Sequence, residues 1–332
     1  MNAKSSATPR TKRRAPPPLE MVCWESPDFR LITGGMSSPV IVCLWLRFAR
    51  RLLPLALGLV ALGAEARPSL SVQPRTAKPG DPVLITLRGF ETPPTGTLDG
   101  RALRFFKARD TFQALVGLSV EQPVGTVDVK VVGPESAGGE PVELVERLQV
   151  VTPGYPERRL QVASKYIEPP ESVKARLAED QAALTAAFSQ ELSPLLFQRN
   201  FAWPRRKRIT AHFGDRRSFN GKLQRQHFGT DIAGAMGAPI RAANDGVVVM
   251  TRDNYSEGNS VLVYHGGGLY TTYFHLSGFS VKEGAKVKQG QKLGVVGRTG
   301  RVTGPHLHWG VKIDGVWVDS ETLLKLDFFA PP

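Results

Sequence analysis

Glycine and proline interrupt this 332-residue chain so often that a bundle of long helices is excluded. The sequence contains 33 glycines and 26 prolines, above average usage for both, and these residues favour turns between short strands. Hydrophobic residues make up 41% of the chain and charged residues 22%, which excludes both a disordered chain and a polytopic membrane protein. We therefore expect an all-β protein with enough residues for two domains.

The N-terminal region predicts export. A basic stretch at residues 47–51 precedes a 12-residue apolar core at residues 52–63 and a small-x-small site that ends at Ala66. This order is typical of a secretory signal peptide, whereas a membrane-spanning helix needs roughly 20 apolar residues. We expect translation to start at Met36, cleavage to follow Ala66, and the mature chain to lie in the periplasm or cell envelope. The alternative is an uncleaved anchor.

After this upstream extension and signal peptide, residues 1–66, the segment 67–152 has the pattern of short strands separated by turns. The expected strands lie at residues 69–73, 82–88, 113–117, 125–132 and 142–151, with turn signals at residues 79–81, 99–100 and 138–139. This spacing resembles an immunoglobulin-like β module. Because the segment contains no histidine and no cysteine, we expect it to bind, space or cover a site and not to catalyse.

Residues 153–201 are expected to form a linker that carries one amphipathic helix. The helix follows Pro169 and Pro170 and is expected to continue towards Pro194. Its apolar residues recur at three- to four-residue multiples, at positions 173, 177, 184, 188 and 192. Two interpretations are open: a helix that joins two β domains, which we favour, or a segment that lies across an active-site groove as an inhibitory cover.

The remaining residues, 202–332, are expected to form a second all-β domain. The expected strands lie at residues 239–242, 246–250, 260–264, 269–275, 292–296 and 307–313. Glycine or proline separates most of them, and no long helical pattern is present.

All six histidines lie in this second domain, between residues 212 and 308. The two cysteines, Cys23 and Cys43, precede the predicted cleavage site, so a metal site in the mature chain would have to use histidines and carboxylates. In an extended chain, residues two or four apart share a face, as in His306-Leu-His308 and His227-Phe-Gly-Thr-Asp231. A catalytic zinc site has three protein ligands and a water, and two histidines with one carboxylate fit that count.

These motifs occur together with others between about Ile209 and Leu324, including Phe213-Gly-Asp, Tyr273-Phe-His-Leu and Thr303-Gly-Pro-His-Leu-His. As a set they resemble the lysostaphin-like, or LytM-type, zinc endopeptidases of bacterial peptidoglycan. The resemblance implies a C-terminal barrel-sandwich catalytic domain. It further implies that Zn²⁺ is held by three ligands and that two histidines are catalytic: His227, Asp231 and His308 as ligands, His275 and His306 as catalytic residues.

The function that follows from the resemblance is an exported zinc metalloendopeptidase that hydrolyses peptide cross-links of peptidoglycan through a zinc-activated water. We assign His306 as the base and His275 as the group that stabilises the oxyanion, with exchange of these roles left open. We expect a monomer that acts on peptidoglycan peptide stems. A regulatory protein partner and coverage of the groove are left open. In a Gram-negative envelope, the resemblance implies a D,D-endopeptidase in the periplasm.

Other functions were weighed against this one. The alternative is a non-enzymatic LytM-type module that binds the wall or activates an amidase, but retention of all five site residues favours an enzyme. Residues 281–294 resemble biotinyl and lipoyl carrier domains, yet the chain lacks a Met-Lys-Met acceptor. The net charge of +13 suits an anionic partner, and nucleic acid is disfavoured because the chain is predicted to be exported and has no recognised nucleic-acid motif.

Several further residues have two interpretations each. His265 is expected to be a turn histidine, and His212 a local substitution near the groove without a catalytic role. Asn220 and Arg217 either orient the substrate or have no function. The basic run at residues 205–208 is either a contact for wall carboxylates or, as we favour, the solvated end of the linker.

Overall fold

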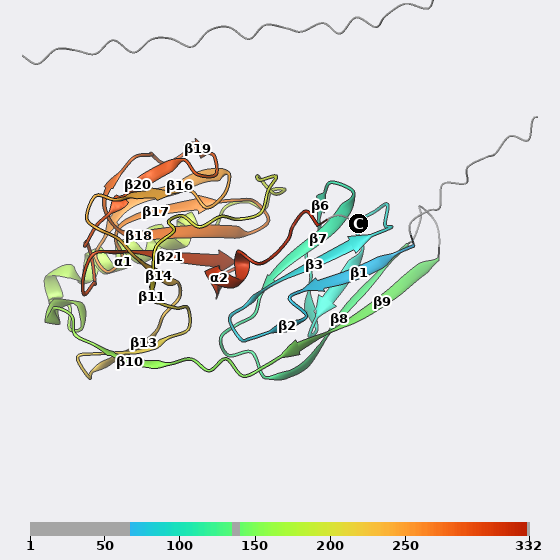
Figure 1. The fold of residues 1–332 in the computed structure, drawn as a ribbon, viewed down its shortest axis with the longest axis horizontal. Helices are drawn as coiled ribbons and strands as arrows, with labels where there is room; N and C mark the ends of the chain where they lie inside the picture. Colours follow the sequence, from blue (N-terminus) through green and yellow to red (C-terminus); the bar gives the residue numbers. More distant parts are fainter. Residues whose placement is uncertain (1–66, 135–139, 331–332) are drawn as a thin grey trace, which may run out of the picture. The chain divides into compact units, whose positions relative to one another are not determined.

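The computed structural model describes residues 67–134 and 140–330 (Figure 1). The predicted signal peptide, the start at Met36 and the turn at residues 138–139 lie outside the described residues. Within the described ranges, no helix is both long and apolar enough to cross a membrane. Most of the described elements are strands, which confirms the all-β prediction.

Residues 69–150 form two sheets that face each other. One sheet has the order β1-β3-β7-β6 and the other β2-β9-β8-β4-β5. Their bounds are Ser69–Gln73 for β1, Thr76–Ala77 for β2, Pro82–Arg88 for β3, Thr95–Leu98 for β4, Arg101–Ala102 for β5, Phe106–Ala108 for β6, Thr111–Gly117 for β7, Gly125–Pro134 for β8 and Pro141–Val150 for β9. Val83 and Ile85 of β3 pack with Val129 of β8 and Leu148 of β9 in one core, so burial between the sheets holds them together. The immunoglobulin-like topology stays a prediction.

The segment after β9 contains a strand and the predicted helix. Its elements are β10 (Glu157–Leu160), the 3₁₀ turns η1 (Ser164–Tyr166) and η2 (Glu171–Val173), and α1 (Lys174–Ala187). The expectation that the helix continues towards Pro194 is wrong, because α1 ends at Ala187. Phe188 leaves the helical conformation and packs edge-on against Tyr270, while Leu192 is exposed and adds no packing that would extend the helix.

The C-terminal strands form a large sheet in the order β11-β14-β21-β18-β17-β16-β19, and β15, β20 and β22 pair at its side. A smaller sheet has the order β10-β12-β13. The bounds are Ile209–Ala211 for β11, Arg216–Phe219 for β12, Leu223–Gln226 for β13, Thr230–Ala233 for β14, Pro239–Arg241 for β15, Gly246–Asn254 for β16, Gly258–Tyr264 for β17, Leu269–Phe279 for β18, Lys286–Val287 for β19, Lys292–Val296 for β20, His306–Ile313 for β21, Val316–Val318 for β22 and Ser320–Leu323 for α2. Tyr273 of β18 and Trp309 of β21 are fully buried, so these central strands anchor the core beside the site.

The front sheets share this larger core. Leu84 of β3 and Leu115 of β7 belong to the same buried cluster as Phe197 and Phe328. Gln113 also donates a hydrogen bond to the carbonyl oxygen of Phe328 at 2.7 Å. Because the described residues from 67 onward belong to one compact unit, the domain boundaries at residues 152 and 201 stay predictions.

Candidate metal centre

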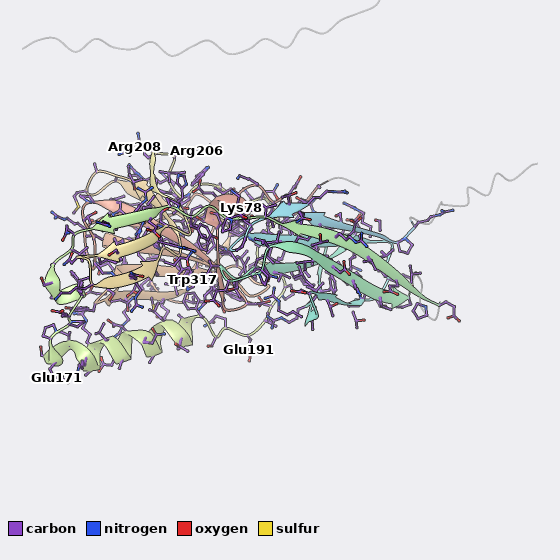
Figure 2. All side chains as sticks on the ribbon, turned by 90° about the horizontal axis from the view of Figure 1, so that it is seen from below. Lys78, Glu171, Glu191, Arg206, Arg208 and Trp317 are labelled. Atoms are coloured by element: carbon purple, nitrogen blue, oxygen red, sulfur yellow. The ribbon has the colours of Figure 1, made fainter. Side chains whose placement is uncertain are left out.

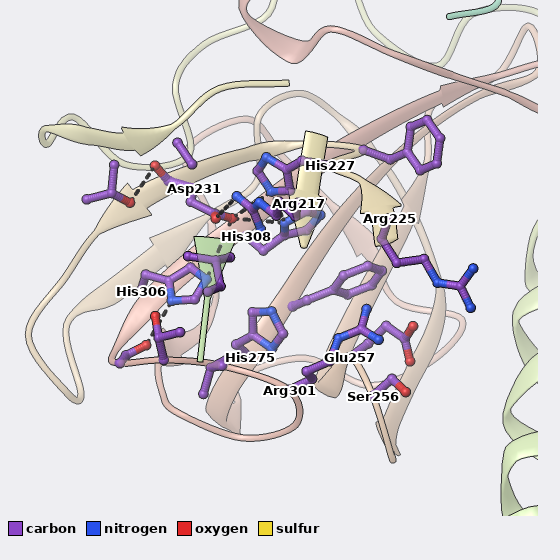
Figure 3. Close-up of a pocket in the computed structure, with 18 of the residues that line it drawn as sticks. Arg217, Arg225, His227, Asp231, Ser256, Glu257, His275, Arg301, His306 and His308 are labelled. Atoms are coloured by element: carbon purple, nitrogen blue, oxygen red, sulfur yellow. Dashed lines mark hydrogen bonds and ion pairs between the residues drawn. The ribbon is translucent and has the colours of Figure 1, made fainter. Parts of the chain in front are cut away.

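Two neighbouring strands and the turn before them bring three potential metal ligands together (Figure 3). Asp231 of β14 and His308 of β21 are direct cross-strand partners, and His227 precedes β14. His227 Nε2 lies 3.0 Å from Asp231 Oδ1 and 3.0 Å from His308 Nδ1, and His308 Nδ1 lies 3.0 Å from Asp231 Oδ1. The three atoms therefore form a nearly equilateral triangle.

The chemistry of this triangle fits a cation. His227 Nδ1 donates to the carbonyl oxygen of His212 at 2.7 Å, so Nε2 is the nitrogen that a neutral ring offers as a ligand, and it faces the anionic Oδ1 of Asp231. Tetrahedral zinc with bonds of about 2.0–2.1 Å would separate its ligand atoms by about 3.3 Å, close to the spacing in this triangle. Two acceptors at this separation are stabilised when a metal ion lies between them.

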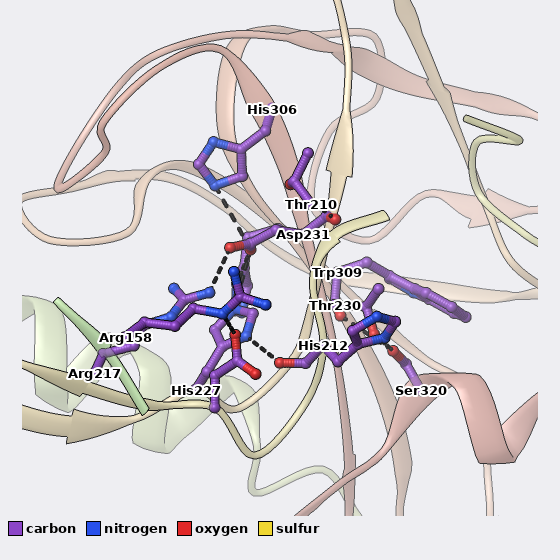
Figure 4. Close-up of polar contacts among 12 residues, drawn as sticks. Arg158, Thr210, His212, Arg217, His227, Thr230, Asp231, His306, Trp309 and Ser320 are labelled. Atoms are coloured by element: carbon purple, nitrogen blue, oxygen red, sulfur yellow. Dashed lines mark hydrogen bonds and ion pairs between the residues drawn. The ribbon is translucent and has the colours of Figure 1, made fainter. Parts of the chain in front are cut away.

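The charges around the triangle favour the ligand forms of its side chains. Burial alone would raise the pKa of Asp231, but the adjacent His227 and His308 bring it well below its usual value. Burial lowers the pKa of His308 to about 4, so that imidazole is neutral near pH 7. Arg217 of β12 donates to Asp231 Oδ2 at 2.7 Å and leaves Oδ1 directed at the triangle (Figure 4). Sequence reasoning left Arg217 without a definite role, and the structure places it on this carboxylate.

The two histidines predicted to be catalytic lie beside the triangle. His306 Nδ1 donates to the carbonyl oxygen of Gly304 at 2.8 Å, and His275 Nδ1 donates to that of Thr299 at 2.9 Å. In the neutral form of each ring, Nε2 is therefore the acceptor nitrogen, and the ring centroids are 5.0 Å apart. His306 Nε2 lies 3.6 Å from Asp231 Oδ1.

His275 has an unusual backbone in the middle of β18. Its φ is +65°, in the left-handed region that non-glycine residues rarely adopt, and its N–H donates to the carbonyl oxygen of Glu257 at 3.0 Å. A local departure of this kind re-aims a side chain that regular alternation would place elsewhere. Burial, reinforced by His306 and His308, holds the pKa of His275 well below its usual value, so this imidazole is neutral.

All five predicted site residues line one groove of about 1030 Å³. Residues of α1 and Phe188 form part of its wall, and Figure 2 shows this helix along one side of the molecule between Glu171 and Glu191. The groove wall also includes Arg205, Lys207 and Arg208 of the basic run. The favoured interpretation from the sequence was that this run is the solvated end of the linker. Arg206 is exposed and is absent from the groove lining.

The remaining candidates have structural contacts. His265 follows β17 as expected of a turn residue, but it is fully buried and its Nδ1 donates to the carbonyl oxygen of Asp245 at 2.7 Å. The His212 ring lies outside the groove lining, 2.6 Å from Glu321 Oε1, while its backbone carbonyl orients His227. Asn220 binds the backbone of residue 162 with both side-chain atoms, so it joins β10 to the β12–β13 turn.

A groove of an all-β fold that holds a His-Asp-His triangle and two further histidines has the features of a catalytic metal site. The sequence model of Peptidase family M23 matches residues 225–320, so the chain contains a domain of this family. The resemblance to lysostaphin-like, LytM-type peptidases is thereby confirmed.

Curated relatives match about a third of the chain. Peptidoglycan DD-endopeptidase ShyA of Vibrio cholerae is 47% identical over 109 residues, which are 32% of this chain and 25% of the relative. DD-carboxypeptidase/endopeptidase Mpg of Neisseria meningitidis is 44% identical over 108 residues, again 32% of this chain and 25% of the relative. The chain therefore matches about a quarter of the length of these relatives.

A solved structure extends the similarity beyond this domain. A peptidase M23 structure from Pseudomonas aeruginosa has a TM-score of 0.52 and 26% identity, and the match covers 74% of this chain and 93% of that one. The match therefore includes residues outside 225–320.

Proposed function

We propose that this protein is an exported, zinc-dependent endopeptidase that hydrolyses peptide cross-links of peptidoglycan in the periplasm or cell envelope. The observation that carries the proposal is the triangle of ligand atoms 3.0 Å apart, with the imidazoles of His275 and His306 beside it in one groove. The names of the relatives support the substrate class. The proposed partner is the peptide stem of peptidoglycan. We also propose that the protein is a monomer and that its modules span residues 67–152, 153–201 and 202–332.

His227, Asp231 and His308 would hold the zinc. When bound there, zinc supplies a Lewis acid for the scissile carbonyl and a water of lowered pKa. Arg217 keeps the Asp231 carboxylate in one orientation, and the His212 carbonyl does the same for the His227 ring.

His306 is proposed as the general base. Its Nδ1–H is held by a backbone carbonyl, so its free Nε2 accepts a proton from the attacking water and returns it to the leaving amine. His275 also presents a free Nε2 and would have to gain a proton before it donated a hydrogen bond to the developing oxyanion. Its low pKa opposes that step until negative charge develops nearby. A His275→Ala variant with unaltered turnover would remove His275 from the mechanism.

The test is the release of soluble muropeptides from purified, cross-linked peptidoglycan by residues 67–332. We expect release to stop in a chelator and in His308→Ala, and to return in the wild type when zinc is added. His212→Ala is the matched control, because that ring is exposed and outside the groove lining. Release that persists in both the chelator and His308→Ala would contradict a zinc mechanism, while mass analysis of the products identifies the bond. No release from folded, zinc-loaded protein would favour the wall-binding or amidase-activating module.

A further inference from the structure

Three arginines stand side by side across the small sheet next to the metal centre. Arg158 of β10 pairs in register with Arg217 of β12, and Arg217 pairs in register with Arg225 of β13. Like charges on directly opposed positions of neighbouring strands destabilise a sheet. An anion near these guanidinium groups would offset that repulsion.

The first two arginines of the row have their anions within the protein. Arg158 forms an ion pair with the buried carboxylate of Asp215, and Arg217 donates to Asp231 at 2.7 Å (Figure 4). Arg225 differs. Among the residues that the structure describes, no carboxylate lies within ion-pair distance of its guanidinium, and its side chain lines the groove.

A fourth arginine approaches the same place from another loop. The backbone N–H of Arg301 donates to the carbonyl oxygen of Ser256 at 2.8 Å, which fixes the loop beside the β16–β17 turn. The guanidinium lies over the ring of Phe219, 5.0 Å from the ring centroid. Arg301 also lines the groove (Figure 3). Within the described part of the chain, Arg301 also has no carboxylate at ion-pair distance.

The surroundings of Arg301 are electrostatically unfavourable for a cation. Burial lowers the pKa of its guanidinium, Arg225 and Arg217 lower it further, and Glu257 only partly opposes them. The groove as a whole is lined by eight cationic side chains and two carboxylates, those of Asp231 and Glu257. A ligand that brings one more carboxylate to Arg225 and Arg301 would relieve this imbalance.

We propose that Arg225 and Arg301 form a subsite that binds a carboxylate of the peptide substrate beside the catalytic histidines. The guanidinium fork suits a carboxylate, because two parallel N–H groups meet its two oxygens. The proposal rests on the proposed function and narrows it to cross-linked peptides with a free carboxyl group near the cleaved bond. That carboxylate belongs either to the C-terminus of a peptide stem or to an amino-acid side chain.

The experiment compares three forms of one synthetic cross-linked peptide: both carboxyl groups free, the terminal one amidated, or the side-chain one amidated. For the free form, we expect Arg225→Gln and Arg301→Gln each to raise KM roughly ten- to hundredfold, with kcat changed much less. Arg225→Lys, which keeps the charge, should recover part of the loss. Arg206→Gln is the matched control, since Arg206 is exposed and absent from the groove lining. One of the two amidated forms should be cleaved with equal KM by wild type and by both Gln variants. The carboxyl group that is amidated in that form is the one that the subsite binds.

Two results would overturn the subsite: an unchanged KM for the free form in both Gln variants, or an equal rise of KM for all three forms. Melting temperatures within a few degrees of wild type show that the variants fold. If the zinc-loaded wild type cleaves none of the three peptides, the proposed function fails, and calorimetric binding then tests the subsite separately. In that case, tighter binding of the free form by wild type but not by the Gln variants supports the subsite, and equal affinity for all forms refutes it.

Discussion

Gly229 stands between two of the proposed zinc ligands, and its missing side chain makes room for the third. A Cβ atom at this position would lie 2.6 Å from His308 Nε2 and 2.8 Å from the carbonyl oxygen of Trp309. We expect Gly229→Ala to displace the His308 ring and to weaken zinc binding by roughly tenfold or more, because overpacking typically costs about 1–3 kcal/mol. Competition with a chromophoric chelator measures the affinity.

Gly304→Ala is the matched control for this substitution. Gly304 also lines the groove, but a Cβ there would meet no atom within 4 Å. Its zinc affinity should equal that of the wild type. Wild-type affinity in Gly229→Ala would show that the His308 ring moves without cost.

His265 predicts a pH dependence of stability that is independent of the metal. Complete burial lowers its pKa to about 4, whereas an exposed histidine titrates near 6.5. The unfolded chain therefore binds the proton first, so the stabilising contribution is fully present above pH 6.5 and is lost as the pH falls from 6.5 towards 4. Between pH 7.5 and 4.5 the loss is of the order of 2 kcal/mol.

Urea unfolding of wild type and His265→Gln at both pH values isolates this contribution. We expect wild type to be more stable than the variant at pH 7.5, and this difference in free energy to shrink by about 2 kcal/mol at pH 4.5. A difference that stays constant with pH would mean that His265 does not titrate in this range.

The sequence predicted which side chains meet at the site, but not what holds them there. Spacing indicated that His306 and His308 share a face and that His227 and Asp231 can do so. The resemblance to lysostaphin-like peptidases then implied that His227, Asp231 and His308 are the ligands. The contact between Arg217 and Asp231 depends on how β12 packs beside β14, and no pattern in the sequence gives that placement. The contact between the His212 carbonyl and His227 could not be predicted either, since every residue carries the same backbone group.

At the scale of elements, α1 connects to the site through one buried carboxylate. Asp180 Oδ1 accepts from Arg252 at 3.0 Å, and its Oδ2 accepts from the backbone N–H of Tyr255 at 2.7 Å. The β16–β17 turn that begins at Tyr255 also contains Glu257, whose carbonyl oxygen holds the backbone of His275. Hydrophobic periodicity predicted the helix but not this connection, which is made by a polar residue outside the apolar pattern.

Asp180→Asn should loosen this connection. An amide offers one acceptor oxygen to two donors, so either Arg252 or the Tyr255 N–H loses its partner. We expect a loss of about 1–3 kcal/mol in the free energy of unfolding, measured in urea. Limited proteolysis should also cut α1 faster in the variant. Glu179→Gln is the control, because Glu179 is the exposed neighbour on the same helix, and an equal effect of both substitutions would contradict a specific role for Asp180.

For the whole molecule, the sequence predicted that both regions consist of strands and located several of them, among them β3, β7, β18 and β21, but it did not predict their common core. Alternation within a strand shows which face is buried, not which element covers it. Leu84 and Leu115 lie in strands that the sequence assigned to a separate front module, yet they pack in one cluster with Phe197 and Phe328. Recognition of the family could not correct this, because its motifs lie between about Ile209 and Leu324 and none falls in the front sheets.

This shared core predicts the relative stability of three fragments. Residues 67–332 keep the whole cluster, residues 153–332 lose Leu84 and Leu115, and residues 202–332 also lose Phe197 and Phe201. Each buried side chain of this size contributes about 1.5–3 kcal/mol, so the shortest fragment loses an amount comparable to the entire stability of a typical domain. We therefore expect melting temperatures to fall in that order, with residues 202–332 largely unfolded at 37 °C. Equal melting temperatures for residues 202–332 and 67–332 would show instead that the C-terminal region folds independently of the front sheets.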